Sequence, residues 1–245
     1  MEHWEAIRPG GYRFVWDDDL FRPGTDTFLL SSLPRLKAGM RVLELGCGTG
    51  LLSMLLLQRQ PQLLVTGIDI QPDAIRLAQK AVLENHLQDH LSFRTEDLRT
   101  AAFGSVHFDL VVCNPPYFPA GSGASAPDAA RRTAREEVAC TLEDICSAAA
   151  RALRWGGSFC LVHRPERLVD VLATMRSLRL EPKRLRFVQK TATASPSLFL
   201  VEGRLGGNPG LTVETPLILQ KADGTPSEEL DAIYYRTNPT TEETI

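Results

Sequence analysis

Four consecutive residues, Asn114-Pro115-Pro116-Tyr117, follow the apolar run 108–113 and combine oxygen acceptors with a flat aromatic ring. The nitrogen of an adenine, guanine or glutamine NH2 is a weak nucleophile, because its lone pair is conjugated. The Asn114 side-chain oxygen and the Pro115 carbonyl can accept hydrogen bonds from such an NH2 and turn its lone pair outward. The prolines remove N–H donors, and Tyr117 offers a face to a planar group. The tetrapeptide predicts that a planar amine is held for group transfer, although it also fits a turn after a buried strand.

Residues 41–50 predict a buried strand that runs into a glycine-rich turn, and a helix follows over 51–58. The third glycine comes one residue earlier than in the dinucleotide fingerprint, and Glu44 stands two residues before the first glycine, which argues against NAD. A carboxylate suits the ammonium group of S-adenosylmethionine, and helix-start N–H groups suit its carboxylate. The predicted contacts at this methionine end are Glu44, Gly46, Cys47, Gly48 and Gly50.

Two further carboxylates follow the next predicted strands. Asp69 ends the apolar run 63–68, where a doubly wound sheet places a carboxylate that receives ribose hydroxyls. Asp97 follows the strand 91–94 and can accept a hydrogen bond from an adenine amino group. Each acid taken singly also fits a helix cap or a solvated loop charge, but polar groups behind successive strand ends favour a cofactor site. The neighbours of these acids, Ile70 and Leu98, complete the predicted site.

The elements downstream extend the same α/β pattern. A helix predicted over 141–153 leads into the apolar strand 158–162, and another strand is predicted at 184–188. Residues 197–202 have the pattern of a final antiparallel strand. Strands and helices that alternate in this way predict one mostly parallel sheet with crossover helices.

Composition and length fit one main domain. At 245 residues and 43% hydrophobic, the chain can bury a substantial core. No apolar stretch is long enough to span a bilayer, and residues 1–5 lack the features of a secretion signal, so we expect a cytoplasmic protein without a membrane partner. Five cysteines without a C-x-x-C pair favour buried thiols over disulfides or a metal site. We expect an N-terminal extension over 1–30, folded as a hairpin or an extended segment, a main domain over 31–236 and a frayed tail over 237–245.

Together these motifs resemble the class I S-adenosylmethionine-dependent methyltransferases of the N-P-P-Y kind, which methylate amino groups. Within them, the chain is similar to the bacterial tRNA adenine-N6 methyltransferases that modify position 37 of a valine tRNA. That family has a glycine-threonine-aspartate segment before the first strand, matched here by Gly24, Thr25 and Asp26. It also has an aromatic residue after N-P-P-Y, matched by Phe118, and an A-R-x-E stretch, matched by 134–137. The resemblance spans residues 14–235.

The resemblance implies a Rossmann-like, seven-stranded sheet with an antiparallel last strand, and S-adenosylmethionine as cofactor. Thr25 and Asp26 join the predicted cofactor site on this basis. The substrate is then an adenine of a tRNA anticodon loop, which is already partly unpaired and costs less to extrude than a base in a duplex. Asn114 and the Pro115 carbonyl hold its N6 amino group while Tyr117 stacks on the ring. The sequence leaves the oligomeric state open.

Two other functions stay open. Residues 22–26 also resemble the R-P-x-T-E segment of the glutamine-N5 methyltransferases that modify release factors and share N-P-P-Y. Those enzymes usually carry a helical domain before this segment, and only 21 residues precede Arg22 here, which favours the tRNA reading. The other alternative is a cofactor-binding module that contacts RNA without catalysis, although such a module has no need for Asn, Pro, Pro and Tyr together.

The charge distribution indicates where RNA could bind. The formal net charge is −3, yet residues 131–190 contain 13 Lys and Arg against 7 Asp and Glu. A basic segment beside the predicted site suits phosphate attraction, although a charge run on a helix is also commonly a solvated face. Guanidinium groups can clamp phosphates. The predicted RNA contacts are Tyr117, Phe118, Arg131, Arg132, Arg135, Arg164, Lys183 and Arg184.

Overall fold

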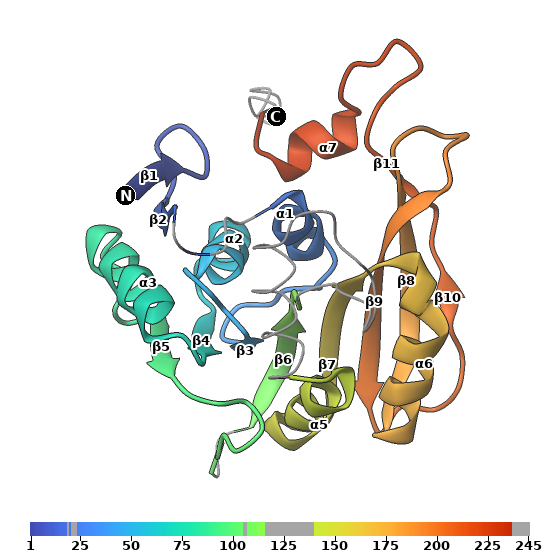
Figure 1. Cartoon of the computed structure of the whole chain (residues 1–245). Coiled ribbons are helices and arrows are strands. Elements are labelled where there is room, and N and C mark those ends of the chain that lie inside the picture. The colour runs from blue at the N-terminus through green and yellow to red at the C-terminus, as the bar shows by residue number, and fades with distance from the viewer. Residues whose placement is uncertain (19, 21–23, 105–106, 116–139, 237–245) are drawn as a thin grey trace, which may run out of the picture.

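A computed structural model describes residues 1–18, 20, 24–104, 107–115 and 140–236 (Figure 1). A central twisted sheet has helices on both faces, and a separate hairpin lies beside helices α2 and α3. The hairpin strands are β1 (Glu2–Ala6) and β2 (Arg13–Asp17). The helices are α1 (Thr25–Ser32), α2 (Leu51–Arg59), α3 (Pro72–Glu84), α5 (Leu142–Ala152), α6 (Leu168–Ser177) and α7 (Glu228–Ile233), with a 3-10 turn, η1 (Pro165–Arg167).

The main sheet has the order β5-β4-β3-β6-β7-β9-β8, and two short strands pair with the outer strand β8. Strand β9 runs antiparallel to both β7 and β8, and the other neighbouring pairs are parallel. The predicted mostly parallel α/β sheet with an antiparallel last strand is therefore confirmed. The strands are β3 (Arg41–Leu45), β4 (Leu64–Asp69), β5 (Leu91–Thr95), β6 (Phe108–Cys113), β7 (Leu153–His163), β8 (Leu180–Gln189), β9 (Pro196–Leu205), β10 (Thr212–Val213) and β11 (Leu217–Ile218).

The chain reverses its direction of travel across the sheet at β3. Strand β4 lies on one side of β3 and strand β6 lies on the other, so this is the topological switch point. In open α/β sheets, ligands bind outside the carboxyl ends of the strands at such a point. The residues that follow β3, β4 and β6 are therefore the ones that this fold brings to a site.

The core forms two layers because successive strand residues face opposite sides of the sheet. Val42 and Leu110 belong to the cluster that also contains buried residues of α1, α2 and α3. Leu43 and Val111, their direct neighbours in sequence, belong to the cluster with α5 and α6. Helix α2 is buried over seven of its nine residues, which explains why it is apolar all round.

The N-terminal hairpin is attached to α3 by polar contacts. The Arg13 backbone N–H donates to Asn85 Oδ1 at 2.7 Å, and Lys80 Nζ lies 2.6 Å from Glu2 Oε1. The boundary predicted at residues 30–31 falls inside α1, so it marks no break in secondary structure. Within the described residues, no helix is long and apolar enough to cross a membrane.

Candidate active site

The ends of β3, β4 and β6 bring three predicted motifs to one edge of the sheet. Glu44 is in register with Gly67 of β4 and Val112 of β6, and Leu45 is in register with Cys113. Asn114 follows Cys113 directly, so it lies beside the start of the glycine-rich turn. Asp69 is the last residue of β4, at the same edge.

The side chain of Asn114 is oriented by α1. Its Nδ2 donates to the Thr27 hydroxyl oxygen at 3.0 Å, and Thr27 is itself buried. This bond holds the amide nitrogen toward the helix and thereby fixes the direction in which the amide oxygen points. Pro115 is buried next to it. Thr25 and Asp26 form the first turn of the same helix, one turn or less from Thr27.

The glycine-rich turn is tied to the end of β4. Gly46, Gly48 and Gly50 have φ of +66°, +51° and +83°, a region that residues with side chains rarely adopt. The Gly48 N–H donates to Asp69 Oδ2 at 2.8 Å, and the Gln71 N–H donates to Oδ1 at 2.9 Å. Asp69 therefore already positions the turn, in addition to any contact with a ligand.

Glu44 is buried and lies at the start of α2. Its Oε2 accepts from the Ser53 N–H at 3.0 Å and also contacts the Ser53 hydroxyl, so the carboxyl group caps the helix, whose N-cap residue Gly50 offers no side chain. Burial, together with the nearby Asp69 carboxylate, raises the pKa of Glu44 to about 8. No lysine or arginine of the described chain forms an ion pair with either acid.

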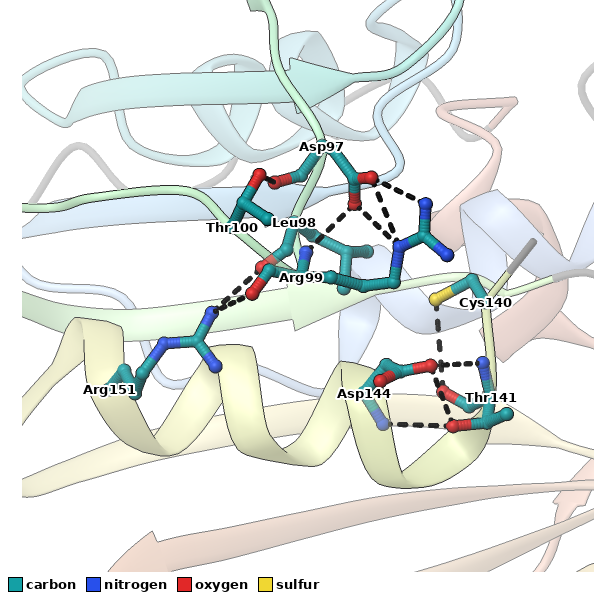
Figure 2. Close-up of polar contacts among 8 residues, drawn as sticks. All are labelled: Asp97, Leu98, Arg99, Thr100, Cys140, Thr141, Asp144 and Arg151. Carbon is teal, nitrogen blue, oxygen red and sulfur yellow. Dashed lines mark hydrogen bonds and ion pairs between the residues drawn. The ribbon is translucent and has the colours of Figure 1, made fainter.

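Asp97 lies in a different environment at the end of β5. Its carboxylate accepts from the backbone N–H and the guanidinium of Arg99, and its side chain is 26% exposed (Figure 2). Arg99 holds the pKa of Asp97 below its ordinary value. Arg151 of α5 donates to the carbonyl oxygens of Leu98 at 2.8 Å and Arg99 at 3.3 Å, which fixes this loop against the helix.

Residues 15–178 match the family model described as methyltransferase small domain. The tRNA1(Val) (adenine(37)-N6)-methyltransferase of Tolumonas auensis is 32% identical over 235 residues, which cover 91% of this chain and 95% of that relative. The chain belongs to the methyltransferase small domain family. A relative of the same name from Porphyromonas gingivalis is also 32% identical and covers 75% of this chain and 74% of its own length.

Solved structures agree with this family assignment at the level of the fold. The crystal structure of a predicted O-methyltransferase from Agrobacterium tumefaciens has a TM-score of 0.68 and 20% identity, over 86% of this chain and 96% of that one. The structure of precorrin-6y C5,15-methyltransferase from Geobacter metallireducens has a TM-score of 0.54, over 78% of this chain and 93% of that one. The predicted family and the Rossmann-like architecture are both confirmed.

The cofactor of this methyltransferase is S-adenosylmethionine, and the site has the properties that this cation requires. Glu44 and Asp69 supply two buried carboxyl groups without a cationic partner among the described residues. A Cβ added at Gly46 or Gly48 would meet nothing within 4 Å, so the backbone is open there. The Thr49 hydroxyl is buried and has no hydrogen-bond partner in the described part of the chain. These residues fit a cationic ligand such as S-adenosylmethionine.

The predicted RNA contacts of the methyltransferase that the structure describes do not lie together at one site. Arg164 is exposed and follows β7 at the carboxyl edge of the sheet. Lys183 lies in the first half of β8, which runs parallel to β7, so it is nearer the opposite edge, and its Nζ donates to the Asn208 carbonyl at 3.1 Å. Arg184 is half-buried and binds Glu202 at 2.5 Å and Glu214 at 2.6 Å.

These contacts give Arg184 a structural role between β8, β9 and the segment after β10, and they place Lys183 away from Asn114. Ile70 follows Asp69 and is exposed, and Leu98 lies in the loop held by Arg151. The remaining predicted residues lie outside the described part of the chain: Pro116, Tyr117, Phe118, Arg131, Arg132 and Arg135.

His163 ends β7 at the edge that carries Asn114, but its environment disfavours a proton. Its Nδ1 accepts from the Arg164 N–H at 2.8 Å. Burial lowers the pKa of His163 to about 4, and the charge of Arg167 contributes in the same direction. His163 is therefore neutral at physiological pH.

Sequence reasoning missed several residues that the structure places at the site. Thr27 contacts Asn114 across 87 positions of the chain, and no local pattern marks that pairing. Ser53 is the third residue of α2, and its backbone N–H has no acceptor within the helix. Such N–H groups commonly donate to a nearby carboxylate, so the link to Glu44 could have been found. Arg99 follows Asp97 by two residues, so this ion pair is local in the sequence.

Proposed function

We propose that this methyltransferase methylates the exocyclic N6 of an adenine in tRNA, at position 37 of a valine tRNA. The observation that carries the proposal is the Asn114 amide, which Thr27 holds at the end of β6 beside the glycine-rich turn. An amide fixed in this way can present an oxygen to a planar amino group. The names of the relatives from Tolumonas auensis and Porphyromonas gingivalis support an adenine of tRNA as the acceptor.

Each residue of the proposed site has a role that follows from its chemistry. Asn114 and the Pro115 carbonyl accept from the N6 amino group and turn its lone pair away from the ring. Tyr117 supplies a stacking surface for the adenine, worth about 1–3 kcal/mol for a base on an aromatic face. S-adenosylmethionine supplies an electrophilic methyl group when it is bound. We assign no general base, because the methylated amine is acidic enough to lose its proton to water.

The residues of the proposed cofactor site divide along the strand ends. Glu44 and the glycine-rich turn hold the methionine end, with the helix-start N–H groups of α2 for its carboxylate. We assign Thr25 and Asp26, in the first turn of α1, to the same end. Asp69 is placed to receive the ribose hydroxyls, and Asp97 to accept from the adenine amino group.

The RNA surface that we propose begins at the carboxyl edge of the sheet. Arg164 is exposed there, and Arg131, Arg132 and Arg135 follow the N-P-P-Y motif in the chain. Cations at this edge would attract the phosphates of an anticodon loop and weaken binding as salt rises. We also propose a main domain that spans residues 31–236.

The direct test is methyl transfer from labelled S-adenosylmethionine to three acceptors: a valine tRNA transcript, the same transcript with guanine at position 37, and a peptide release factor. Nucleoside mass analysis should find N6-methyladenosine in the first transcript and no product in the second. Transfer to the release factor alone would replace the tRNA proposal with glutamine methylation. Transfer to none of them would overturn both.

Asn114→Ala separates chemistry from cofactor binding in the same assay. Loss of the acceptor oxygen should lower the rate of methyl transfer about a hundredfold or more, because misplacement of a reacting group by about 1 Å can cost that much. The affinity for S-adenosylhomocysteine should stay near that of the unmodified protein. The control is Ser92→Ala in β5, the outer strand at one edge of the sheet. This variant should leave the rate of methyl transfer and the affinity unchanged.

A further inference from the structure

A cleft lies between the N-terminal hairpin, α1, the start of α2 and the residues that follow α7. Figure 1 shows the hairpin and α7 on the same side of the molecule, above α2 and α1. The cleft has a volume of about 280 Å3, just below the range of about 300–1,000 Å3 that is typical of small-molecule sites, so it has room for one planar group. Its lining side chains include Glu5, Trp16, Phe28, Leu51, Tyr234 and Arg236.

A stack of flat groups belongs to this lining. Phe28 of α1 and Tyr234 stack with their ring centroids 4.3 Å apart and 9° between their planes. The guanidinium carbon of Arg236 lies over the Tyr234 ring, 4.7 Å from its centroid. Because Phe28 covers one face of Tyr234, the guanidinium covers the other. The Arg236 side chain is 55% exposed, so its plane is accessible at the end of the stack.

A guanidinium plane and an ordered indole are surfaces that bind bases. Proteins that recognise single-stranded RNA stack unpaired bases on aromatic rings and on arginine planes. Trp16 of β2 contributes a second flat side chain from the hairpin. Its Nε1 donates to Glu5 Oε1 at 2.7 Å, and its ring stacks on His3 with the centroids 4.2 Å apart. These contacts order the indole before a ligand binds, so little side-chain entropy is lost on binding.

The charged groups at the cleft favour a neutral planar ligand over a phosphate. Arg236 lines the cleft, but Glu5 lines it as well, and Asp231 lies 3.7 Å from the Arg236 guanidinium. A phosphate would therefore meet a carboxylate there. The N–H groups of a nucleobase can instead donate to a carboxylate, which only accepts hydrogen bonds.

The cleft borders the proposed acceptor site. Phe28 directly follows Thr27, whose hydroxyl accepts from the Asn114 amide. Leu51 directly follows Gly50, the last glycine of the glycine-rich turn. A loop of RNA that presents an adenine to Asn114 therefore brings its neighbouring nucleotides to the cleft.

Two walls of the cleft come from segments outside the matched family domain. The family model covers residues 15–178, which include neither β1 nor α7. Glu44, Asp69 and Asn114, which serve the proposed methyl transfer, all lie inside that range. The additional segments are therefore available for the choice of acceptor.

We propose that this cleft binds the nucleobase next to the target adenine in the acceptor RNA. The inference rests on the proposed function, because it names a second contact with the same RNA. The base stacks on the Arg236 guanidinium, at the end of the stack of Phe28 and Tyr234, with Trp16 beside it. The contact anchors the loop while the adenine reaches Asn114, and it leaves the reacting atoms untouched. It therefore raises the affinity for RNA without changing the affinity for the cofactor.

Binding of a fluorescein-labelled valine anticodon stem-loop tests the proposal, measured by anisotropy with S-adenosylhomocysteine present. Arg236→Ala should weaken binding about tenfold, because it removes the plane on which the base stacks. Arg236→Lys should weaken it nearly as much, since a lysine keeps the charge but has no plane. The matched control is Arg176→Ala, an exposed arginine that pairs with Glu181 at 3.4 Å near the amino end of β8, and it should leave binding unchanged.

Stem-loops that lack one base assign the contact to a nucleotide. One abasic loop lacks the base before the target adenine, and the other lacks the base after it. The unmodified protein should bind one of the two about tenfold more weakly than the complete loop. Arg236→Ala should bind that abasic loop and the complete loop equally, because the effects of two groups in contact are not additive. No loss for either abasic loop, or the same losses in Arg236→Ala, would overturn the proposal.

Other roles of the cleft predict different results. Full binding by Arg236→Lys would indicate a phosphate contact and reject the base. A parallel loss of S-adenosylhomocysteine affinity in Arg236→Ala would place the cleft in the cofactor site instead. Trp16→Leu should weaken binding of the stem-loop severalfold, whereas Trp155→Leu, which changes an exposed tryptophan near the start of β7, should not. Equal binding by these two variants would contradict the cleft as the site of the base.

The proposed function and this inference fail in different ways. Methyl transfer to no tRNA would remove the proposed function, and the inference with it. A tRNA that is methylated, together with equal binding of the stem-loop by Arg236→Ala and Arg176→Ala, would reject the inference alone.

Discussion

Glu44 and Asp97 belong to the same carboxyl edge of the sheet, Glu44 on the central strand β3 and Asp97 after the outer strand β5, and their charges are balanced in opposite ways. Glu44 is 3% exposed, lies near a second acid and has no ion-pair partner in the described chain. Asp97 is partly exposed and is bound by an arginine two residues away. Burial raises the pKa of the first group to about 8, whereas Arg99 lowers the pKa of the second.

The different surroundings of Glu44 and Asp97 suit different parts of a ligand. A buried carboxyl group without a cation is costly, so it either keeps its proton or awaits a cationic partner. An ammonium group such as that of S-adenosylmethionine can supply that charge at Glu44. At Asp97 the charge is already balanced, and the group contributes a directed hydrogen-bond acceptor. In the proposed cofactor site, Glu44 would serve the charge of the ligand and Asp97 its hydrogen bonding.

Asp69→Ala should have the largest effect on cofactor binding, because Asp69 belongs to the buried end and also holds the glycine-rich turn. The Gly48 and Gln71 N–H groups lose a charged acceptor, and each such bond contributes about 1.5–3 kcal/mol. The affinity for S-adenosylhomocysteine should fall about a hundredfold in calorimetry. Asp73→Ala, an exposed acid in the first turn of α3, should leave it unchanged. Equal affinities for the two variants would contradict the assignment.

Gly50→Ala should destabilise the fold at the buried end. A Cβ at this position would lie 2.3 Å from Phe93 Cζ, and the residue has a φ of +83°. Overpacking costs about 1–3 kcal/mol, and the backbone strain adds to it. Urea unfolding should show this loss, with a smaller one for Gly46→Ala, which has the strain without the clash. A second change, Phe93→Leu, should recover part of the loss in Gly50→Ala, and no recovery would reject the clash.

Glu44 should make both stability and cofactor binding depend on pH. The folded protein keeps the Glu44 proton up to about pH 8, whereas the unfolded chain releases it near pH 4.5, so the folded state binds more protons between these values. The contribution of Glu44 to the free energy of unfolding is therefore largest below pH 4.5 and decreases as the pH rises toward 8. Urea unfolding measured between pH 4.5 and 8 should show this pH dependence of the free energy of unfolding, and Glu44→Gln should remove it.

The protons released on cofactor binding provide an independent measurement of the protonation of Glu44. At pH 7, binding of S-adenosylhomocysteine should release close to one proton, measured by calorimetry in two buffers with different ionisation enthalpies. Methylthioadenosine lacks the ammonium group and should release none. Asp97→Asn should leave the proton release intact, because that group is already ionised. Proton release that persists in Glu44→Gln would assign the proton to another group.

The sequence predicted the elements of this edge well because their signals are local. A run of apolar residues ended by glycines or by an acid has few structural interpretations. Glu44 is the last but one residue of β3, Asp69 ends β4, and Asn114 follows β6. The family resemblance added the seven-stranded sheet with its antiparallel last strand. These are the parts of the site that depend on a short stretch of chain.

The parts that could not be predicted depend on contacts between distant segments. Lys183 lies in the first half of β8, away from the carboxyl end of that strand. Only the direction of β8 in the sheet reveals this position. Arg184 finds Glu214 thirty residues later, after a short strand. Thr27 reaches Asn114 from α1, a helix that packs against α2 and β7, and residue types alone do not encode that contact.

Thr49→Val should have the smallest effect, and its sign distinguishes a ligand contact from a packing defect. The Thr49 hydroxyl is buried, and no described group bonds to it, so an apolar group of the same shape should raise the stability of the empty protein, by up to about 1 kcal/mol. If that hydroxyl awaits the cofactor, the affinity for S-adenosylhomocysteine should fall severalfold in the same variant. Thr27→Val, which removes the partner of Asn114, should instead lower stability.

Stability and affinity must therefore move in opposite directions in Thr49→Val. A gain in stability with unchanged affinity would make the hydroxyl an uncompensated polar group of the glycine-rich turn, without a role in binding. A loss of both would show that the hydroxyl supports the fold. Only the opposed pair of changes places Thr49 with Glu44 and Asp69 in the proposed cofactor site, where the two carboxyl groups are buried without a cation and a charged ligand can supply one.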